Sequence, residues 1–457
     1  MTTSPITSLD LFAGTGWGVA CQRLGIIENG VEIMPEACAS REAAGMSTVF
    51  HDVWDGLADE SIVPAHDLLI ASPPCQTFSA AGKGAGRQAL DDVLRLVPVA
   101  ADPRADLRAA GAGLDDRTAL VLTPLAYAVR FQPALIALEQ VPAVLPVWEA
   151  VAEELRGRGY SVAVGILNAE QYGVPQTRRR AILVARNDGA EAKLPTPTHS
   201  RYYSRDPKRL DEGVLPWVSM AEALGWGLGR RPSPTITGGG TETGGAEPIA
   251  KLARYTSRPD WNPRAWGFTD RPAVTVGNAV GRGLIGGSGA KASVVRSIED
   301  GTSIPSEGDG SNYAAATRIT PDEAAILQSY PPYATAKELA EYAFALVPEG
   351  GNWRDLPDDL AREVMGGAYK SGGGRTGYFR RLHRDLPSPT IMGSPSQKST
   401  YLGHPTENRP INTAEAATLQ SYPTPFPFQG TKTKQFLQIG NAVPPLLAEH
   451  ILSALIA

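Results

Sequence analysis

The chain has 457 residues, of which 42% are hydrophobic, and its formal net charge is −5. This length predicts roughly two or three domains with a large core, and the lack of any run of about 18 apolar residues argues against a transmembrane helix. The start, MTTSPITSLDLF, has no basic stretch followed by an apolar core, so we expect a cytoplasmic protein. The three cysteines, Cys21, Cys38 and Cys75, predict free thiols, because they have no zinc-ligand spacing and are too few for a disulfide framework.

The charge is unevenly distributed along the chain. Residues 1–190 carry 15 Lys and Arg against 22 Asp and Glu, whereas residues 191–457 carry 28 against 26. The stretch 366–402 has six basic residues and one acidic residue. Because a local basic stripe rather than the net charge meets phosphates, the acidic total does not exclude a nucleic-acid partner.

The first part of the chain alternates between expected strands and expected helices. The strands are ITSLDLF (6–12), HDLLIASPP (66–74), PALIALEQV (133–141), YSVAVGIL (160–167) and RRAILVA (179–185), and the helices are 19–25, 118–131 and 144–159. This alternation predicts an α/β fold with a doubly wound, mostly parallel sheet. Ligands bind outside the carboxyl ends of such strands, where AGTGWG (13–18) and SPPCQ (72–76) lie.

The composition changes after Leu194, where Pro, Gly, Thr and Trp become more frequent. We therefore place a domain boundary near 190–200. The second region contains repeats: 231–240, 271–280 and 386–395 share a Pro-x-x-Thr core, and RITPDEAAILQSYPPY (318–333) is echoed by RPINTAEAATLQSYPTPF (409–426). These repeats indicate a structural duplication or a trace of recombination. The last stretch, 444–457, predicts a terminal helix.

Two acids follow expected strands near the glycine-rich loop AGTGWG. Glycines after a first strand allow a tight turn and a close approach to a ligand. Glu32 in GVEIM is placed to bind ribose hydroxyls, and Asp52 in FHDVWD could end a third strand and meet an adenine amino group. The alternative for each acid is a solvated surface residue.

Cys75 directly follows Pro73 and Pro74, which give a rigid, non-helical presentation of its side chain. A cysteine thiolate is a nucleophile, although an inert buried cysteine behaves as a small hydrophobe. Its context favours the nucleophile: Glu139 ends another strand, and alternation places Arg178 and Arg180 on one face of a further strand, with Arg179 on the other.

A thiol, a carboxyl and guanidinium groups at one sheet edge fit the chemistry of a pyrimidine. A thiolate added to C6 makes C5 nucleophilic, a carboxyl hydrogen-bonded to N3 stabilises the resulting charge, and an arginine holds the O2 carbonyl. A methyl sulfonium beside C5 would supply the electrophile.

These motifs resemble those of the DNA (cytosine-5)-methyltransferases of bacteria and phages. DLFAGTGWG, GVEIM, HDVWD, SPPCQTFS, LEQV, QYGVPQTRRR and LQIGNAVPP follow the family's order across almost the whole chain. The resemblance implies an S-adenosylmethionine-dependent methyltransferase fold with a smaller, irregular, β-rich target-recognition domain. It also implies a base flipped out of the duplex.

The resemblance assigns catalytic roles to individual residues. Cys75 would attack C6, Glu139 would contact N3 and the exocyclic amine, and Arg180, with Arg178 beside it, would hold O2. The catalytic loop would also include Pro74, Gln76 and Ser79.

It assigns the cofactor site in the same way. Phe12 would stack near the adenine of S-adenosylmethionine, Glu32 would bind its ribose and Asp52 its adenine amine. The rest of the implied cofactor site consists of Ala13, Gly14, Thr15, Gly16, Gly18, Ile33, Val53, Pro74, Asn441 and Ala442. No metal is implied.

Three features depart from the family pattern. Trp17 replaces a usual glycine and should crowd or cover the cofactor, whereas Gln140 replaces the usual Asn and should leave activity intact. An extra stretch at about 84–113 is expected to be either a mobile cover over DNA or a tolerated surface insertion. GNAV at 277–280 lacks the following prolines and is taken as a decoy for 440–445.

The resemblance divides the chain into a catalytic part at 1–194, a target-recognition region at 195–430 and a segment at 431–457 that completes the catalytic domain. Within 366–391, aromatic residues and glycines accompany basic side chains that suit guanine edges or phosphates. The predicted DNA-binding residues are Lys370, Arg375, Arg380, Arg381 and Arg384. The alternatives are a solvated basic face here, or recognition by 195–330.

The expected partner is double-stranded DNA bound by a monomer, with a cognate restriction endonuclease as a further possible partner. Three rivals stay open. An RNA cytosine methyltransferase would keep the chemistry but usually has a shorter variable region. A DNA-binding homologue without catalysis would explain the repeats. A nicotinamide dehydrogenase would explain AGTGWG but not SPPCQ or GNAVPP.

Overall fold

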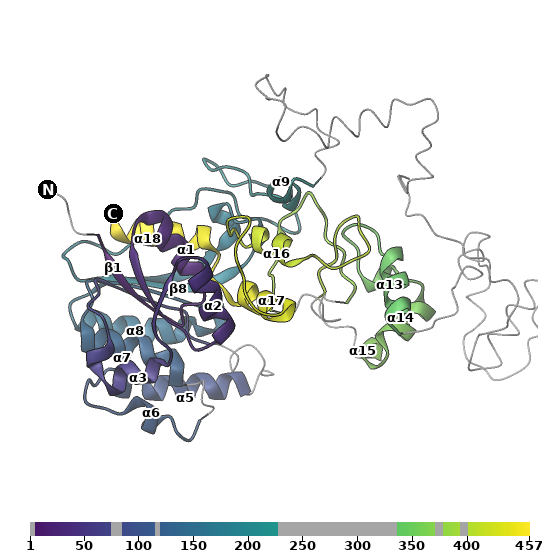
Figure 1. Ribbon diagram of the computed structural model, residues 1–457. Helices are drawn as coiled ribbons and strands as arrows, with labels where there is room; N and C mark the ends of the chain where they lie inside the picture. The colour runs from purple at the N-terminus through teal and green to yellow at the C-terminus, as the bar shows by residue number, and fades with distance from the viewer. Residues whose placement is uncertain (1–4, 75–84, 115–118, 227–335, 371–377, 394–400) are drawn as a thin grey trace, which may run out of the picture. The chain divides into compact units, whose positions relative to one another are not determined.

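The computed structural model describes residues 5–74, 85–114, 119–226, 336–370, 378–393 and 401–457. Its central element is a seven-stranded sheet with the strand order β3-β2-β1-β4-β5-β8-β6 (Figure 1). The strands are β1 (Thr7–Leu11), β2 (Ile27–Val31), β3 (Ser47–Phe50), β4 (Leu68–Ala71), β5 (Leu135–Gln140), β6 (Ser161–Asn168) and β8 (Arg179–Arg186). The strands predicted from sequence are thereby confirmed.

The sheet is doubly wound and mostly parallel. β1 pairs in parallel with β2 and β4, β2 with β3, and β4 with β5, whereas β8 runs antiparallel between β5 and β6. The chain moves outward from β1 to β3 and then returns to the other side of β1 through β4. The carboxyl ends of β1 and β4 therefore form a topological switch point, where such sheets bind ligands.

Helices cover both faces of this sheet (Figure 1). The helices of the sheet region are α1 (Gly16–Leu24), α2 (Pro35–Ala43), α3 (Val53–Ala58), α5 (Ala85–Ala100), α6 (Leu107–Ala110), α7 (Thr123–Phe131), α8 (Leu145–Gly157) and α18 (Pro445–Ile456). The other described helices are α9 (Met220–Leu224), α13 (Ala336–Leu346), α14 (Asp358–Met365), α15 (Gly367–Lys370), α16 (Thr413–Leu419) and α17 (Lys432–Asn441).

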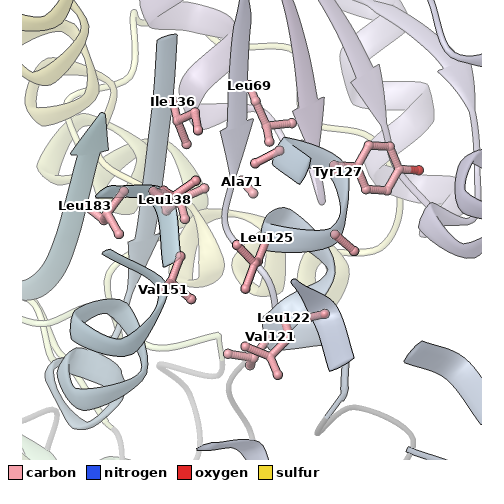
Figure 2. Close-up of a cluster of buried hydrophobic side chains, with 14 of the residues drawn as sticks. Leu69, Ala71, Val121, Leu122, Leu125, Tyr127, Ile136, Leu138, Val151 and Leu183 are labelled. Carbon is pink, nitrogen blue, oxygen red and sulfur yellow. The ribbon is translucent and has the colours of Figure 1, made fainter. Parts of the chain in front are cut away.

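Successive residues of the central strands enter two different cores. Leu69 and Ala71 of β4 join one core with α3, α5, α7 and α8, in which Leu125 and Tyr127 are also buried (Figure 2). Leu68 and Ile70 join a second core with α1 and α18. Burial on both faces explains why these strands read as continuous apolar runs instead of alternating with polar residues.

The described part of the insertion at 84–113 packs into the protein core. It is therefore neither the mobile cover nor the surface insertion that the sequence led us to expect. It contains α5, whose residues Val93, Val97 and Ala100 are buried in the first core. These side chains recur at intervals of four and three residues, as on one face of a helix. The helix packs against α7 and α8, so this part of the insertion is a core element.

The described chain belongs to two compact units, each built from several segments of the sequence. Compact units comprise 1–233, 347–355 and 367–457 on the one hand, and 234–346 and 356–366 on the other. In the first unit, the backbone N–H of Met220 donates to Leu386, and a third core joins Ile391, Leu419 and Phe436. In the second, the described elements are α13 and α14.

The region 195–430 is not β-rich where the structure describes it. Besides isolated bridges, β9 (Ser388–Pro389) is the one strand among its described residues, and it pairs with β7 (Gln176–Thr177) of the catalytic part. The backbone there is mostly irregular and interrupted by short helices. Its hydrogen bonds must therefore be completed by side chains, which bears on the role of its arginines.

The stretch Lys432–Ile456 is long and apolar enough by composition alone to cross a membrane. It consists of α17 and α18, however, and α18 packs along α1 and against β5 and β8. Leu447, Ile451 and Leu455 of α18 are buried in the second core. This burial is what a core helix of a globular protein shows.

Candidate active site

A cavity of about 810 Å³ lies at the carboxyl ends of the five parallel strands β1 to β5. It extends from the glycine-rich loop after β1 to Glu139 at the end of β5. The residues predicted from sequence that line it are Phe12, Ala13, Gly14, Thr15, Gly16, Glu32, Ile33, Asp52, Val53, Pro74, Glu139, Arg178, Arg180, Asn441 and Ala442. Segments far apart in the sequence therefore meet at one site.

The cysteine motif is described only up to Pro74, which lines the cavity. Cys75, Gln76 and Ser79 lie outside the described residues, as do Arg375 and the first repeat copy, 318–333. The roles assigned to these residues stay predictions. Gly18 does not line the cavity: a Cβ on it would lie 2.6 Å from the Met46 sulfur, so this glycine allows close packing instead of cofactor contact.

The glycine-rich loop has an unusual backbone that several contacts fix. Phe12 and Gly14 have φ values of 59° and 47°, in the left-handed region, where strain at a functional site is common. A Cβ on Gly16 would lie 2.2 Å from the carbonyl oxygen of Val443, so a side chain has no room there. The loop thus packs directly against the GNAVPP segment near the carboxyl end of the chain.

Glu32 and Asp52 both have partners within the chain. Glu32 is 9% exposed, and its carboxylate accepts hydrogen bonds from the backbone N–H groups of Gly14 at 2.9 Å and Met34 at 2.7 Å. Asp52 caps α3 by accepting from the N–H of Trp54 at 3.0 Å. A carboxylate has about four acceptor sites, so each acid retains capacity for a ligand hydroxyl or amine. Burial of Glu32 excludes the solvated-surface alternative.

Arg41 supports the backbone of the same loop, a role that no sequence motif indicated. Its buried guanidinium donates to the carbonyl oxygen of Gly14 at 3.0 Å and to both Glu28 oxygens at 2.6 and 2.8 Å. Burial and the nearby Glu28 raise the pKa of the Asp10 carboxyl well above its usual range, because one guanidinium cannot neutralise both acids.

Tyr422 connects the second repeat copy to the glycine-rich loop. Its hydroxyl and the Thr15 hydroxyl form a hydrogen bond of 2.7 Å, and burial raises the pKa of Tyr422, which keeps it neutral. Gln420 from the same copy donates to the carbonyl oxygen of Ile439 at 2.7 Å. The copy at 409–426 therefore supports the site directly.

Glu139 and Arg180 form a buried ion pair at the other end of the cavity. Arg180 Nε lies 2.6 Å from Glu139 Oε1, and the two side chains are 12% and 6% exposed. The pair arises because β5 and β8 are neighbours in the sheet. As alternation predicted, Arg179 is exposed while Arg178 and Arg180 line the cavity.

Arg178 is tied to the backbone of the last motif. Its guanidinium is 1% exposed and donates to the carbonyl oxygens of Gly440 and Ala442 at 2.9 Å each, and to that of Ile391 at 3.3 Å. These bonds hold the GNAVPP segment over the sheet. Although Arg178 lines the cavity, its observed contacts position backbone.

Two side chains hold the start of the cysteine motif. The Gln140 amide donates to the carbonyl oxygen of Pro73 and accepts from the N–H of Val141. The Trp17 indole, which is 1% exposed, donates to Ser72 Oγ at 2.9 Å. Trp17 lines the cavity and at the same time packs in the second core.

The predicted DNA-binding arginines have different environments. Arg381 is a correction: it is 4% exposed, and its guanidinium donates to the carbonyl oxygens of Val347, His404 and Glu407 and to Asn408 Oδ1, at 2.7 to 3.0 Å. The carbonyl oxygens of Val347 and His404 belong to buried residues, and Arg381 supplies their donor. It therefore completes the fold and is not presented to DNA.

Arg384 and Arg380 remain nearer to the surface. Arg384 pairs with Glu349 at 2.9 Å, and its hydrogen bonds lower the pKa of Glu349 although partial burial opposes this. Arg380 is partly buried beside Tyr202, burial lowers its pKa, and its guanidinium has no hydrogen-bond partner among the residues that the structure describes. The Lys370 backbone belongs to α15.

The sequence analysis missed several residues that line the cavity. They are Met34, Ala37, His51, Trp54, Ser72, Arg108, Gly111, Ala112, Leu120, Gln438 and Val443 among others, whereas Trp17, which was expected to crowd or cover the cofactor, does line the cavity. Arg108, from the insertion, lies 5.8 Å from the Trp54 ring centroid. Position directly after a strand was the one available signal for His51 and Ser72. In the described part of the chain, no group of three His, Cys, Asp or Glu side chains could hold a metal ion.

The fold and the cavity define a doubly wound α/β protein with a ligand site at the topological switch point of its sheet. A model of the family described as C-5 cytosine-specific DNA methylase matches residues 6–97, 108–219 and 351–457, more than half of the chain. The chain therefore belongs to this family, as its motifs predicted.

Individual relatives agree with this assignment. The chain is 48% identical over 110 residues to the type II methyltransferase M.PspPI of Psychrobacter sp., a match that covers 24% of this chain and 26% of that protein. It is 25% identical over 465 residues to the type II methyltransferase M1.HphI of Haemophilus parahaemolyticus, covering 99% and 87%. The first matches thus span only about a quarter of their relatives' length.

A solved structure has the same fold. A protein from an Escherichia coli prophage, assigned as a DNA modification methyltransferase, aligns with 99% of this chain and 98% of its own at a TM-score of 0.50 and 18% identity. This likeness supports the architecture of the sheet and its helices.

Proposed function

We propose that the protein transfers a methyl group from S-adenosylmethionine to C5 of a flipped-out cytosine in a specific short duplex DNA site. The observation that carries this proposal is the continuity of the cavity. Phe12, Glu32 and Asp52 line it together with the Glu139–Arg180 pair, and its wall includes Pro74, the residue before Cys75. A nucleotide-like cofactor and a base would therefore lie in one enclosure.

The residues present fit S-adenosylmethionine. Phe12 and Ile33 offer apolar surfaces for an adenine ring, and the Glu32 and Asp52 carboxylates offer acceptors for ribose hydroxyls and the adenine amine. Ile33 is 67% exposed on the protein surface, which a flat ring would partly cover. When bound, this cofactor supplies an electrophilic methyl group on a sulfonium.

The Glu139–Arg180 pair matches one edge of cytosine. N3 and O2 are adjacent on that edge, so a carboxyl and a guanidinium that already touch each other can address both atoms. Pairing also offsets the cost of burying the carboxylate before substrate binds. Glu139 would accept from the exocyclic amine and, when its carboxyl carries a proton, donate to N3, while Arg180 would donate to O2; together these bonds stabilise negative charge on the ring.

Cys75 would act as the nucleophile. Its thiolate Sγ would add to C6, which places the displaced electron pair on C5; that pair would bond the methyl group as the bond from the methyl group to the sulfonium breaks and leaves a neutral thioether. A water molecule would take the C5 proton, and the freed electron pair would re-form the C5–C6 double bond as the C6–Sγ bond breaks and releases the thiolate, so the enzyme is regenerated. Glu139 and Arg180 would hold the base throughout, because both the addition and the elimination pass through the same charged ring.

The DNA partner is inferred from the family and from the recognition region. Cytosine in a duplex is stacked, so it must leave the helix to reach an enclosed cavity. Among the described residues, Arg380 is the best candidate for contacting phosphates or base edges. Lys370, Arg375 and Arg384 are proposed as further contacts, although Arg384 forms an ion pair with Glu349. The type II relatives suggest a restriction endonuclease partner, and we propose action as a monomer.

The test is expression in bacteria that lack cytosine methylation, followed by sequencing of genomic DNA for 5-methylcytosine. We expect methylation at one short motif, absent with Cys75→Ala although that variant still binds DNA. Methylated RNA with unmethylated DNA would replace the substrate, and DNA binding without methylation would indicate a homologue that has lost catalysis. Methylation that persists in Cys75→Ala would refute the mechanism.

A further inference from the structure

Trp17 joins the glycine-rich loop to the backbone that leads into the cysteine motif. It is the second residue of α1, and its indole N–H donates to Ser72 Oγ at 2.9 Å. Ser72 follows the last residue of β4, and both Trp17 and Ser72 line the cavity. The bond spans 55 residues of sequence, so it fixes two loops that are not otherwise neighbours in the chain.

The segment Ser72–Pro74 needs such external support. Its own backbone donor is the Ser72 N–H, which bonds the carbonyl oxygen of Leu11 at a long 3.3 Å. Pro73 and Pro74 have no N–H and cannot continue the ladder of the sheet. Besides this long bond, the segment is held through its acceptors: Trp17 donates to Ser72 Oγ, and Gln140 donates to the Pro73 carbonyl oxygen.

The two donors come from opposite sides of the site. Gln140 follows Glu139 on β5, and thus ties the segment to the base-binding end of the cavity. Trp17 follows Gly16 and ties it to the cofactor end. Its indole is 1% exposed and is packed in the second core with Val443 and Leu447, so the ring has little freedom to move.

We propose that Trp17 is a positioning residue of the methyl-transfer reaction: through Ser72 it sets the distance between the cofactor loop and the segment that precedes the nucleophile. This inference rests on the proposed function. It differs from the expectation that Trp17 crowds or covers the cofactor, because its contribution lies in the indole N–H and not only in its bulk. Loss of that bond should slow turnover without weakening cofactor binding to a similar extent.

The test compares Trp17→Phe and Ser72→Ala with the double variant. Each single change removes one partner of the same bond, so each should lower kcat by about three- to tenfold, the factor that a net hydrogen bond provides. The double variant should lose no more than the larger single loss, because the bond can be broken only once. The dissociation constant of S-adenosylmethionine, measured by calorimetry, should change less than kcat.

Trp148→Phe is the matched control. Trp148 is also fully buried and donates its indole N–H, to the carbonyl oxygen of Ala181, but it does not line the cavity. Trp148→Phe should lose about as much unfolding free energy as Trp17→Phe, while its kcat stays within about twofold of the wild-type value. Ser72→Thr keeps a hydroxyl and should restore most of the turnover lost in Ser72→Ala. This serine series keeps the test decisive if Trp17→Phe does not fold.

Full turnover in Ser72→Ala would overturn the inference, as would additive losses in the double variant. Equal losses of kcat in Trp17→Phe and Trp148→Phe would also overturn it, because they would reduce the role of Trp17 to core packing. An inactive wild type with every substrate would instead refute the proposed function. The two failures are therefore distinguishable.

Discussion

The sheet edge and the basic segment 378–384 are both rich in charged residues, but they use them in opposite ways. At the sheet edge, Glu139 and Arg180 face a cavity because the end of β5 lies beside the start of the antiparallel strand β8. In the basic segment, the Arg381 guanidinium donates to backbone carbonyl oxygens, whereas that of its neighbour Arg380 has no such bond among the described residues. In a sheet, the backbone N–H and C=O groups bond each other, so charged side chains remain available for chemistry. In irregular structure, some charged side chains bond the backbone instead.

The sharpest test of the sheet edge is Glu139→Gln. Glutamine can still accept from Arg180, so the fold should survive, but the ionisable carboxyl that addresses N3 is lost. We expect kcat to fall by about 10² to 10⁴, the usual contribution of a positioned acid or base. Measured single-turnover methyl transfer that stays within tenfold of wild type would remove Glu139 from the mechanism.

In the basic segment, Arg381→Ala should act on stability. Removing the guanidinium takes the donor from the carbonyl oxygens of the buried residues Val347 and His404, which should cost about 2–4 kcal/mol of unfolding free energy. Arg380→Ala is the adjacent control and should change it by less than about 0.5 kcal/mol. Urea titration of the two variants checks this, and equal stabilities would erase the distinction between these arginines.

Two glutamates extend the comparison to pH. Burial raises the pKa of Glu170 to about 6, from 4.5. The folded state therefore binds more protons than the unfolded state between pH 4.5 and 6, so stability falls as the pH rises through this window, by up to about 2 kcal/mol. Glu170→Gln should lack this loss and gain stability relative to wild type above pH 6.

Glu349 in the recognition region should show the opposite sign. Its pKa is lowered, because the hydrogen bonds from Arg384 outweigh the effect of burial. Its contribution is present above pH 4.5 and is lost as the pH falls through the lowered value. Glu349→Gln should therefore be less stable than wild type at neutral pH. Unfolding curves at several pH values that show the same sign for both variants would contradict this contrast.

The smallest expected effect is on DNA affinity. Arg380→Ala should weaken binding of a duplex containing the target motif by about tenfold or less, and the salt dependence should become shallower if the lost contact is to phosphate. Fluorescence anisotropy at two salt concentrations measures both quantities. Unchanged affinity would move recognition to residues other than Arg380, with 195–330 as the next candidate.

The sheet could be predicted from the sequence because strands that are buried on both faces form continuous apolar runs. The site could be predicted in part because charged residues such as Glu139 interrupt these runs at the ends of strands. The sequence could not predict the contacts that fix the loops. Arg41 to Gly14, Tyr422 to Thr15 and Trp17 to Ser72 join segments whose proximity is visible only after folding. For the same reason, composition alone could not separate Arg381 from Arg380.

The central claim is that one cavity holds both the methyl donor and the target base. Its most direct test is a crystal structure of the complex formed with S-adenosylmethionine and a duplex that carries 5-fluorocytosine at the target position, because methyl transfer then leaves C5 without a proton to lose and the bond from C6 to Cys75 persists. The account predicts the adenosyl group against Phe12, Glu32 and Asp52, and the flipped base against Glu139 and Arg180, bonded through C6 to Cys75. A base that remains stacked in the duplex, or a cofactor bound outside this cavity, would contradict it.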